Sequence, residues 1–214
     1  MLINIQNFIP SPLSETFSGS SDLWKNPNIA ILESEILSII SASGKGKSSL
    51  LNSIYGLRKD YEGSIQIDNR DISSFSPAEW SKLRTNKLSI VFQSLNLFPE
   101  LSAIDNVLIK NKLSQFKSEE NIRQLFMEFG IDAQINQAAA KLSFGQQQRV
   151  AIIRALCQPF EAILLDEPFS HLDKENAGIA WNAIKKESEK QGASILIAGL
   201  QEENFISATK TLNI

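Results

Sequence analysis

The sequence is poor in the residues that several common kinds of site require. Its 214 residues include a single cysteine, Cys157, and a single histidine, His171. These counts exclude an internal disulfide, a cysteine-cluster metal site and any site that needs two histidine ligands. No apolar run approaches the roughly 18 residues that a membrane-spanning helix needs, and Met1–Ile5 carry no basic segment. We therefore expect no secretory signal peptide and a cytoplasmic location.

The sequence also has no excess of positive charge. Lys and Arg number 21 against 24 Asp and Glu, so the formal net charge is −3. Because proteins that bind nucleic acid through bulk charge are basic, we expect no nucleic-acid partner. Hydrophobic residues make up 43% of the chain and charged residues 21%, as in an ordinary globular protein. A chain of this length can bury a core without disulfide or metal support.

Short apolar runs predict strands, and helical patterns separate several of them. The helical patterns begin after the glycine- and serine-rich stretch 41–49, after Ser118 and after Ser143. This alternation predicts an α/β fold with a largely parallel sheet covered by helices. Residues 98–145 lack a convincing strand and are interpreted as a helical insertion, whereas Pro10–Ser21 are interpreted as a loop. The predicted strands are 3–6, 36–40, 65–67, 88–92, 162–165 and 194–198.

The stretch 41–49 has the composition of a phosphate-binding loop. It lies between a predicted buried strand and a helical pattern. Its glycines let successive backbone N–H groups point at phosphate oxygens, and the following helix adds its positive N-terminal end. In such a loop Lys47 would bind the β- and γ-phosphates, and Ser48 would coordinate Mg²⁺. Ser41 stands where the pattern has its first glycine, so a plain serine-rich loop is the alternative.

Two other stretches carry chemistry of the same kind. The predicted strand 162–165 ends in Asp166 and Glu167, which suit the Mg²⁺ shell and the polarisation of an attacking water. The alternative is that they only end the strand in a turn. Ser143 precedes a helix and is either an ordinary N-cap or, with the N–H of Gly145, part of an anion-binding helix N-terminus.

In their order along the chain, these stretches resemble the ATP-binding subunits of ABC transporters over essentially the whole length. Residues 83–107 are similar to the branch that includes lipoprotein-releasing, macrolide-export and cell-division ATPases. The resemblance implies one α/β domain over residues 1–214, with a P-loop NTPase core, an antiparallel β region and a helical sub-domain at about 98–145. The matching motifs are Walker A at 41–49, the Q-loop glutamine Gln93, the signature motif and its helix at 142–156, Walker B at 163–167 and the D-loop at 170–173.

The resemblance implies binding and hydrolysis of MgATP by a head-to-tail dimer, of identical or different ATP-binding subunits. ATP binding would close the dimer, and closure would reach transmembrane permease subunits through the groove near Gln93. The protein would therefore lie at the inner face of the membrane. The implied site residues are Glu167 and Gln93 for catalysis, Ser43, Gly44, Lys45, Gly46, Lys47, Ser48, Ser49, Ser143, Gly145 and Gln146 for ATP, and Ser48, Gln93 and Asp166 for Mg²⁺.

Besides Ser41, two further places depart from the family pattern. No aromatic residue stands clearly where the family has its adenine-stacking tyrosine; Pro12 falls near that place, and the other candidates are Leu13, Phe17 and Trp24. Leu200 stands where the family carries its switch histidine, and leucine cannot hydrogen-bond the γ-phosphate or hold the water. We expect slow hydrolysis. A degenerate module with little hydrolysis and an ABC ATPase without a membrane partner stay open as alternatives.

Overall fold

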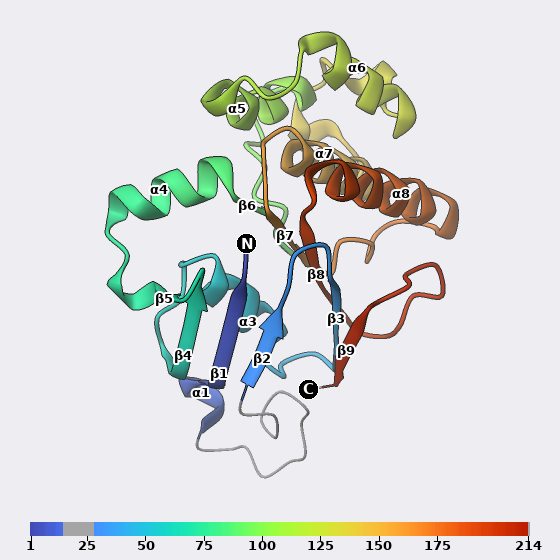
Figure 1. The fold of residues 1–214 in the computed structure, drawn as a ribbon. Coiled ribbons are helices and arrows are strands. Elements are labelled where there is room, and N and C mark those ends of the chain that lie inside the picture. The colour runs from blue at the N-terminus through green and yellow to red at the C-terminus, as the bar shows by residue number, and fades with distance from the viewer. Residues whose placement is uncertain (15–27, 214) are drawn as a thin grey trace.

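The strands form two sheets that lie next to each other (Figure 1) in a computed structural model that describes residues 1–14 and 28–213. One sheet is antiparallel and has the order β2-β1-β4-β5. The other is parallel and has the order β6-β7-β8-β3-β9. The strands are β1 Ile3–Pro10, β2 Asn28–Ile31, β3 Ile36–Ile40, β4 Tyr61–Ile67, β5 Arg70–Asp71, β6 Leu88–Val91, β7 Ala162–Asp166, β8 Ser194–Gly199 and β9 Lys210–Asn213.

Helices cover these sheets and fill the stretch between β6 and β7. Many of them begin at a side chain that caps the helix, such as Ser76, Ser118, Ser143 and Asp173. The helices are α1 Ser11–Ser14, α3 Lys47–Ile54, α4 Pro77–Asn86, α5 Ala103–Ser114, α6 Glu119–Glu128, α7 Phe144–Leu156 and α8 Lys174–Gln191, with short 3₁₀ turns at 72–74, 132–134 and 139–141. No helix within the described residues is both long and apolar enough to cross a membrane.

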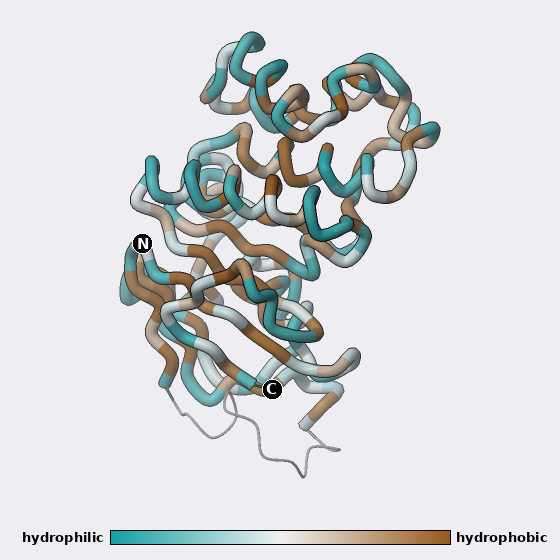
Figure 2. The backbone as a smooth tube through the Cα atoms, turned by 90° about the vertical axis from the view of Figure 1, so that its right-hand side faces the viewer, coloured by the Kyte–Doolittle hydropathy of each residue, from teal (hydrophilic) through white to brown (hydrophobic). Residues whose placement is uncertain are grey.

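The helix α3 lies between the two sheets and places its N-terminus beside the end of β7. It contacts β1 on one side and β7 and β8 on the other. Its side chains Leu50, Leu51 and Ile54 are fully buried in one core with the inward residues of β1 and β4. All residues of β7 are buried, as expected for the inside of a parallel sheet. Figure 2 shows the hydrophobic residues concentrated along the strands.

A second core holds the helices of the 98–145 stretch against α7. Phe126 and Phe129 are fully buried there, together with Val150 and Ile153 of α7. Both α5 and α6 pack on α7. The only β pairing inside the stretch is a single bridge between Ser102 and Ala138. This part of the chain is therefore helical.

The structure confirms the predicted strands, which correspond to β1, β3, β4, β6, β7 and β8, and the predicted helices. The prediction of a loop at Pro10–Ser21 is wrong at its start, because Pro10 ends β1 and Ser11–Ser14 form a helical turn. A proline near a helix start is compatible with the first turn. The remainder, 15–21, lies outside the described residues.

The helical core gives a stability prediction. Phe126→Ala removes a fully buried ring, so it should lower the free energy of unfolding by about 3–5 kcal/mol. The neighbouring Met127 is 66% exposed, so Met127→Ala should change the free energy of unfolding by less than about 0.5 kcal/mol. Urea denaturation measures both. Equal effects of the two substitutions would contradict the burial of α6 against α7.

Candidate nucleotide-binding site

The loop between β3 and α3 curls where glycines adopt backbone angles that other residues disfavour. Gly44 and Gly46 have φ of 79° and 94°. Gly46 is the N-cap of α3, and a Cβ atom there would lie 3.1 Å from Cδ1 of Leu13. The loop therefore brings the free backbone N–H groups of the helix start to the carboxyl end of the parallel sheet, which is where α/β proteins bind ligands.

Lys47 is a buried cation inside this loop. Its Nζ donates hydrogen bonds to the carbonyl oxygens of Ser41, at 2.7 Å, and Ala42, at 3.1 Å, and lies 4.0 Å from Oε1 of Glu167. Burial lowers the pKa of Lys47, and the carboxylates of Glu167 and Asp166 partly oppose that shift. A buried cation of this kind suits a phosphate group, whose negative charge would further stabilise the charged form.

Asp166 at the end of β7 is tied to the start of α3. The hydroxyl of Ser48 donates to its Oδ1 at 3.0 Å. Burial raises the pKa of Asp166; the Ser48 hydrogen bond lowers it, nearby Glu167 raises it and Lys47 lowers it. The arrangement offers oxygen ligands and one carboxylate, the donor set that Mg²⁺ takes when phosphates and waters complete its shell.

Glu167 has a left-handed backbone, which is uncommon for this residue type. Its φ is 48°. Its N–H donates to the carbonyl of Ala198 at 2.9 Å, and its own carbonyl accepts from Nε2 of Gln148 at 3.2 Å. Its Oε2 accepts from Nε2 of Gln93 at 3.2 Å. Contacts from β8 and α7 thus fix the backbone, and the side chain is directed to Gln93 and Lys47.

These groups surround a hollow of about 230 Å³. Gln93 and Glu167, which are far apart in the sequence, line it together, whereas Asp166 does not line it and instead contacts Ser48. The other lining residues are the predicted Ser43, Gly44, Lys45, Gly46, Lys47, Ser48 and Ser49, and also Pro10, Pro12, Leu13 and Arg58. Pro12 and Leu13 are thus at the site, while the other adenine candidates, Phe17 and Trp24, lie outside the described residues.

Sequence reasoning missed Arg58 and Gln148. Nη1 of Arg58 donates to the hydroxyl of Ser49 at 2.8 Å, and its other nitrogens pair with Asp60. In the sequence Arg58 belongs to a short run of charged residues, a pattern that is typical of a solvent-exposed segment. Gln148 is 1% exposed and also donates to the carbonyl of Pro168 at 2.6 Å. A glutamine within a helix carries no signal that it supports a strand end.

The predicted signature residues Ser143, Gly145 and Gln146 do not line this hollow. Ser143 is the N-cap of α7: its hydroxyl accepts from the N–H of Gln146, and Oε1 of Gln146 accepts from the N–H of Ser143. A Cβ on Gly145 would lie 2.8 Å from the carbonyl oxygen of His171. The exposed ring of Phe144 packs against the ring of His171, with 4.2 Å between the two ring centroids. The start of α7 is therefore an outward-facing surface closed on one side by the 170–173 turn.

Leu200 follows β8 directly and is 55% exposed. It shares a hollow of about 360 Å³ with Glu167. The place that the resemblance assigns to the family's switch histidine thus lines a hollow together with Glu167, and the leucine side chain supplies no hydrogen-bonding group.

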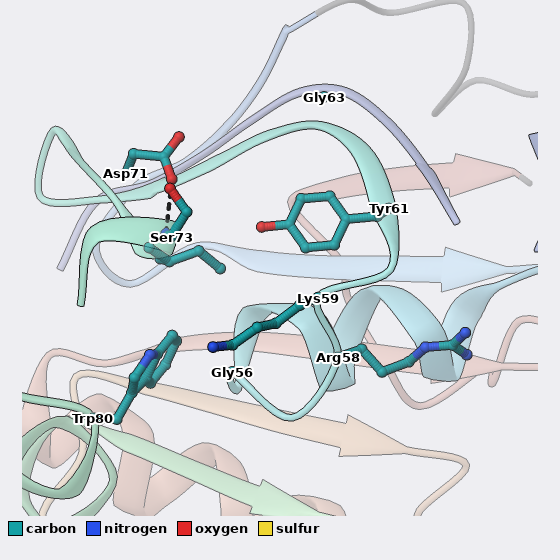
Figure 3. A pocket seen from close by; sticks show the side chains of 9 residues that line it. Gly56, Arg58, Lys59, Tyr61, Gly63, Asp71, Ser73 and Trp80 are labelled. Atoms are coloured by element: carbon teal, nitrogen blue, oxygen red, sulfur yellow. Dashed lines mark hydrogen bonds between the residues drawn. The ribbon is translucent and has the colours of Figure 1, made fainter. Parts of the chain in front are cut away.

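A different hollow, also of about 230 Å³, lies on the other side of Arg58 (Figure 3). Lys59 and Tyr61 extend toward it, and Trp80 borders it from α4. The Asp71 carboxylate accepts from the N–H of Ser73 at 2.8 Å and so is already bonded. Within the described residues no group of three or more Asp, Glu, His or Cys side chains could hold a metal. Because no phosphate-binding loop lines this hollow, we propose no nucleotide binding or catalysis there.

Comparison with known proteins shows the family of the chain. The family described as "ABC transporter" matches residues 24–170. The lipoprotein-releasing system ATP-binding protein LolD of Leptospira interrogans is 34% identical over 200 residues, covering 92% of this chain and 84% of that protein. The ABC transporter ATP-binding protein MJ0796 of Methanocaldococcus jannaschii is 38% identical over 181 residues, covering 81% of this chain and 77% of that protein.

Solved structures of an ABC transporter cassette also match the chain. The dimeric structure of the MJ0796 cassette matches with a TM-score of 0.75 at 29% identity, covering 93% of this chain and 88% of that chain. A dimeric post-hydrolysis state of that cassette, bound to ADP and Pi, matches equally well. The chain belongs to the ABC transporter family. It is an ATP-binding subunit with an ATPase fold, as the resemblance implied.

The buried carboxylate gives a prediction about pH. The pKa of Asp166 is raised above its ordinary 3.8, so its ionisation opposes folding as the pH rises above that value. Asp166→Asn keeps an acceptor for Ser48 and removes the charge. Without nucleotide, this variant should have the larger free energy of unfolding at about pH 7, and its advantage should shrink toward about pH 4.

Urea denaturation across this pH range checks the prediction. Asp60→Asn is the control, because Asp60 is exposed and Arg58 holds its pKa down at about 2. That variant should gain no stability at neutral pH. A loss of stability in Asp166→Asn that does not depend on pH would show that the charge is not the unfavourable element.

Proposed function

We propose that this chain binds and hydrolyses MgATP in a head-to-tail dimer and so drives transmembrane permease subunits. The observation that carries the proposal is the hollow in which the loop 43–49, Gln93 and Glu167 meet. A phosphate-binding loop, a polar side chain and a carboxylate at one place are the parts that phosphoryl transfer to water requires. The relatives are named as ATP-binding subunits of transporters, which supports the transport role over a function without a membrane partner.

Each site residue has a role in this proposal. The backbone of 43–49 and the Lys47 ammonium bind the β- and γ-phosphates. Glu167 is the general base that polarises the attacking water, and its hydrogen bond from Gln93 orients it. Ser48 and Gln93 would hold Mg²⁺, with Asp166 in support. The ion, when bound, neutralises charge that develops on the phosphates.

The dimer follows from where the signature residues lie. Ser143, Gly145 and Gln146 are at an outward-facing helix N-terminus, away from the loop of their own chain. A helix N-terminus attracts anions, so a second subunit is needed to bring it to the γ-phosphate. The dimeric MJ0796 cassette supports this arrangement.

The location and the domain organisation are part of the same proposal. A chain that drives permease subunits lies on the cytoplasmic side, held at the membrane by them. We treat residues 1–214 as one ATP-binding domain whose helical sub-domain, at about 98–145, carries the start of α7. Leu200 makes hydrolysis slow without removing ATP binding, since it changes one contact near Glu167 and none in the loop.

A first experiment tests the dimer and the site together. Glu167→Gln keeps the shape of the side chain and removes the base, so the ATP-bound dimer should persist. Light scattering should show a dimer of this variant with MgATP and a monomer or weak dimer without it. Adding Lys47→Ala should abolish the dimer, because the phosphates lose their buried cation. A dimer that forms equally without nucleotide would overturn the proposal.

A second experiment concerns the rate. Losing one well-placed polar contact costs about 2.7–4 kcal/mol, or roughly 10²–10³ in rate. Purified protein should therefore hydrolyse ATP slowly, and Leu200→His should raise kcat more than it changes ATP affinity, because the gain lies in the transition state. Leu57→His, at another exposed leucine (54%), is the control. Steady-state assays that show a fast wild type and no gain from Leu200→His would contradict the prediction.

A further inference from the structure

Gln148 is a buried side chain of α7 that holds the backbone just after β7. It is 1% exposed. Its Nε2 donates to the carbonyl oxygens of Glu167, at 3.2 Å, and Pro168, at 2.6 Å. The reverse orientation of the amide would set its oxygen against both carbonyl oxygens, so the nitrogen is the atom that faces them. One side chain thus ties α7 to the two residues that follow Asp166.

The backbone of Glu167 needs such support. Its φ of 48° is left-handed, a conformation that persists in a residue of this type only where the surroundings fix it. The N–H of Glu167 is fixed by the carbonyl of Ala198 in β8, at 2.9 Å, and its carbonyl is fixed by Gln148. Ser170 also donates to that carbonyl, but it belongs to the same turn and does not tie the turn to another element. The direction of the carboxylate therefore depends on β8 and α7 together.

α7 contacts the same turn at a second point. A Cβ atom on Gly145 would lie 2.8 Å from the carbonyl oxygen of His171, so the first turn of the helix approaches the backbone there very closely. The ring of Phe144 packs against the ring of His171. The segment 167–171 is thus held by α7 near both of its ends. Because closely packed elements shift together and do not deform freely, a displacement of α7 would displace this segment too.

Gln158 makes the same kind of contact elsewhere in the chain. It is also 1% exposed, and its Nε2 donates to the carbonyl oxygens of Arg84 and Leu88, both at 3.1 Å. Within the described residues, the Oε1 atoms of Gln148 and Gln158 both lack a hydrogen-bond partner. The two side chains therefore differ mainly in what they hold. Leu88 is the first residue of β6, whereas Glu167 carries a carboxylate at the nucleotide hollow.

We propose that Gln148 is a positioning residue for hydrolysis, which holds the backbone of Glu167 so that the carboxylate meets the attacking water. The proposal rests on the proposed function, in which Glu167 is the general base. A general base must lie within hydrogen-bond reach of the water, and a misplacement of about 1 Å can lower the rate roughly 10²-fold. In that function the start of α7 faces the second subunit. A shift of α7 caused by the second subunit would therefore reach the base through Gln148.

Gln148→Met tests the proposal in the full chain, because methionine fills a similar volume and removes both hydrogen bonds. Its kcat for ATP should fall about 10- to 100-fold. Its KM for ATP should change by less than about twofold, because the phosphate loop keeps its contacts. Gln158→Met is the matched control: it removes the same pair of hydrogen bonds and should leave kcat unchanged. Urea denaturation should show similar changes of midpoint for the two variants.

A second measurement does not depend on hydrolysis. The ¹³Cα and carbonyl ¹³C signals of Glu167 report its backbone angles and the hydrogen bond to its carbonyl. Both signals should shift in Gln148→Met and stay in place in Gln158→Met. In a Glu167→Gln background, Gln148→Met should lower the residual rate no further, because the base that it positions is already absent.

Three outcomes would overturn the proposal. Equal losses of kcat in Gln148→Met and Gln158→Met would show a general packing effect. Unmoved Glu167 signals in Gln148→Met would show that this side chain does not hold the backbone, and moved signals with an unchanged kcat would show that the hold does not serve catalysis. A wild type that hydrolyses no ATP would count against the proposed function, and the Glu167 signals would still decide whether Gln148 holds that residue.

Discussion

The hydrogen bond from Ser48 to Asp166 connects the two parts on which the site depends. It joins the first turn of α3 to the last residue of β7, across 118 positions of sequence. The loop before α3 and the carboxylate of Glu167 after β7 take their relative places from this contact. α3 is also packed between the two sheets, so the antiparallel sheet acts as a support that keeps the loop against the strand ends.

The same place concentrates charges that are unfavourable by themselves. Lys47 and Asp166 are 4% and 3% exposed. Burial lowers the pKa of Lys47 and raises the pKa of Asp166, so it favours the neutral form of both side chains. Glu167 also carries a left-handed backbone, a conformation that costs of order 1 kcal/mol or more. Unfavourable groups gathered at one strand end are typical of functional sites, where a ligand completes the charge balance.

Local patterns explain why much of this could be predicted. Buried parallel strands are continuous apolar runs, and the sequence of β3 and β7 shows them directly. Motifs that lie on one loop or strand end, such as 43–49 and Asp166–Glu167, carry their chemistry in adjacent residues. α4 was missed although Ser76, Pro77 and Glu79 form a capping box with a proline at its start. That signal was present, but the helix has a weak apolar pattern.

The remaining features depend on contacts between distant residues, and no local pattern reports them. The short strands β2 and β9 exist because β1 and β3 offer them an edge. Gln148 supports the backbone of Glu167 from another helix. Among the residues that the structure describes, no ion pair includes Lys110 or Arg154, and this depends on how distant elements pack. A sequence shows which residues are charged, but not which charges are left without a partner.

In the proposed function, Leu200 affects hydrolysis and leaves nucleotide binding unchanged. The carbonyl of the preceding Gly199 accepts from the N–H of Ser41 at 3.3 Å, so β8 holds the start of the phosphate loop through its backbone. The side chain at position 200 takes no part in that contact, and Leu200 lines a hollow together with Glu167. On this proposal, a leucine in place of the family's histidine leaves the loop, Lys47 and the start of α7 as they are. In that proposal the change concerns only the group that would hold the water and the γ-phosphate in line, and such a contact matters only once the nucleotide is bound.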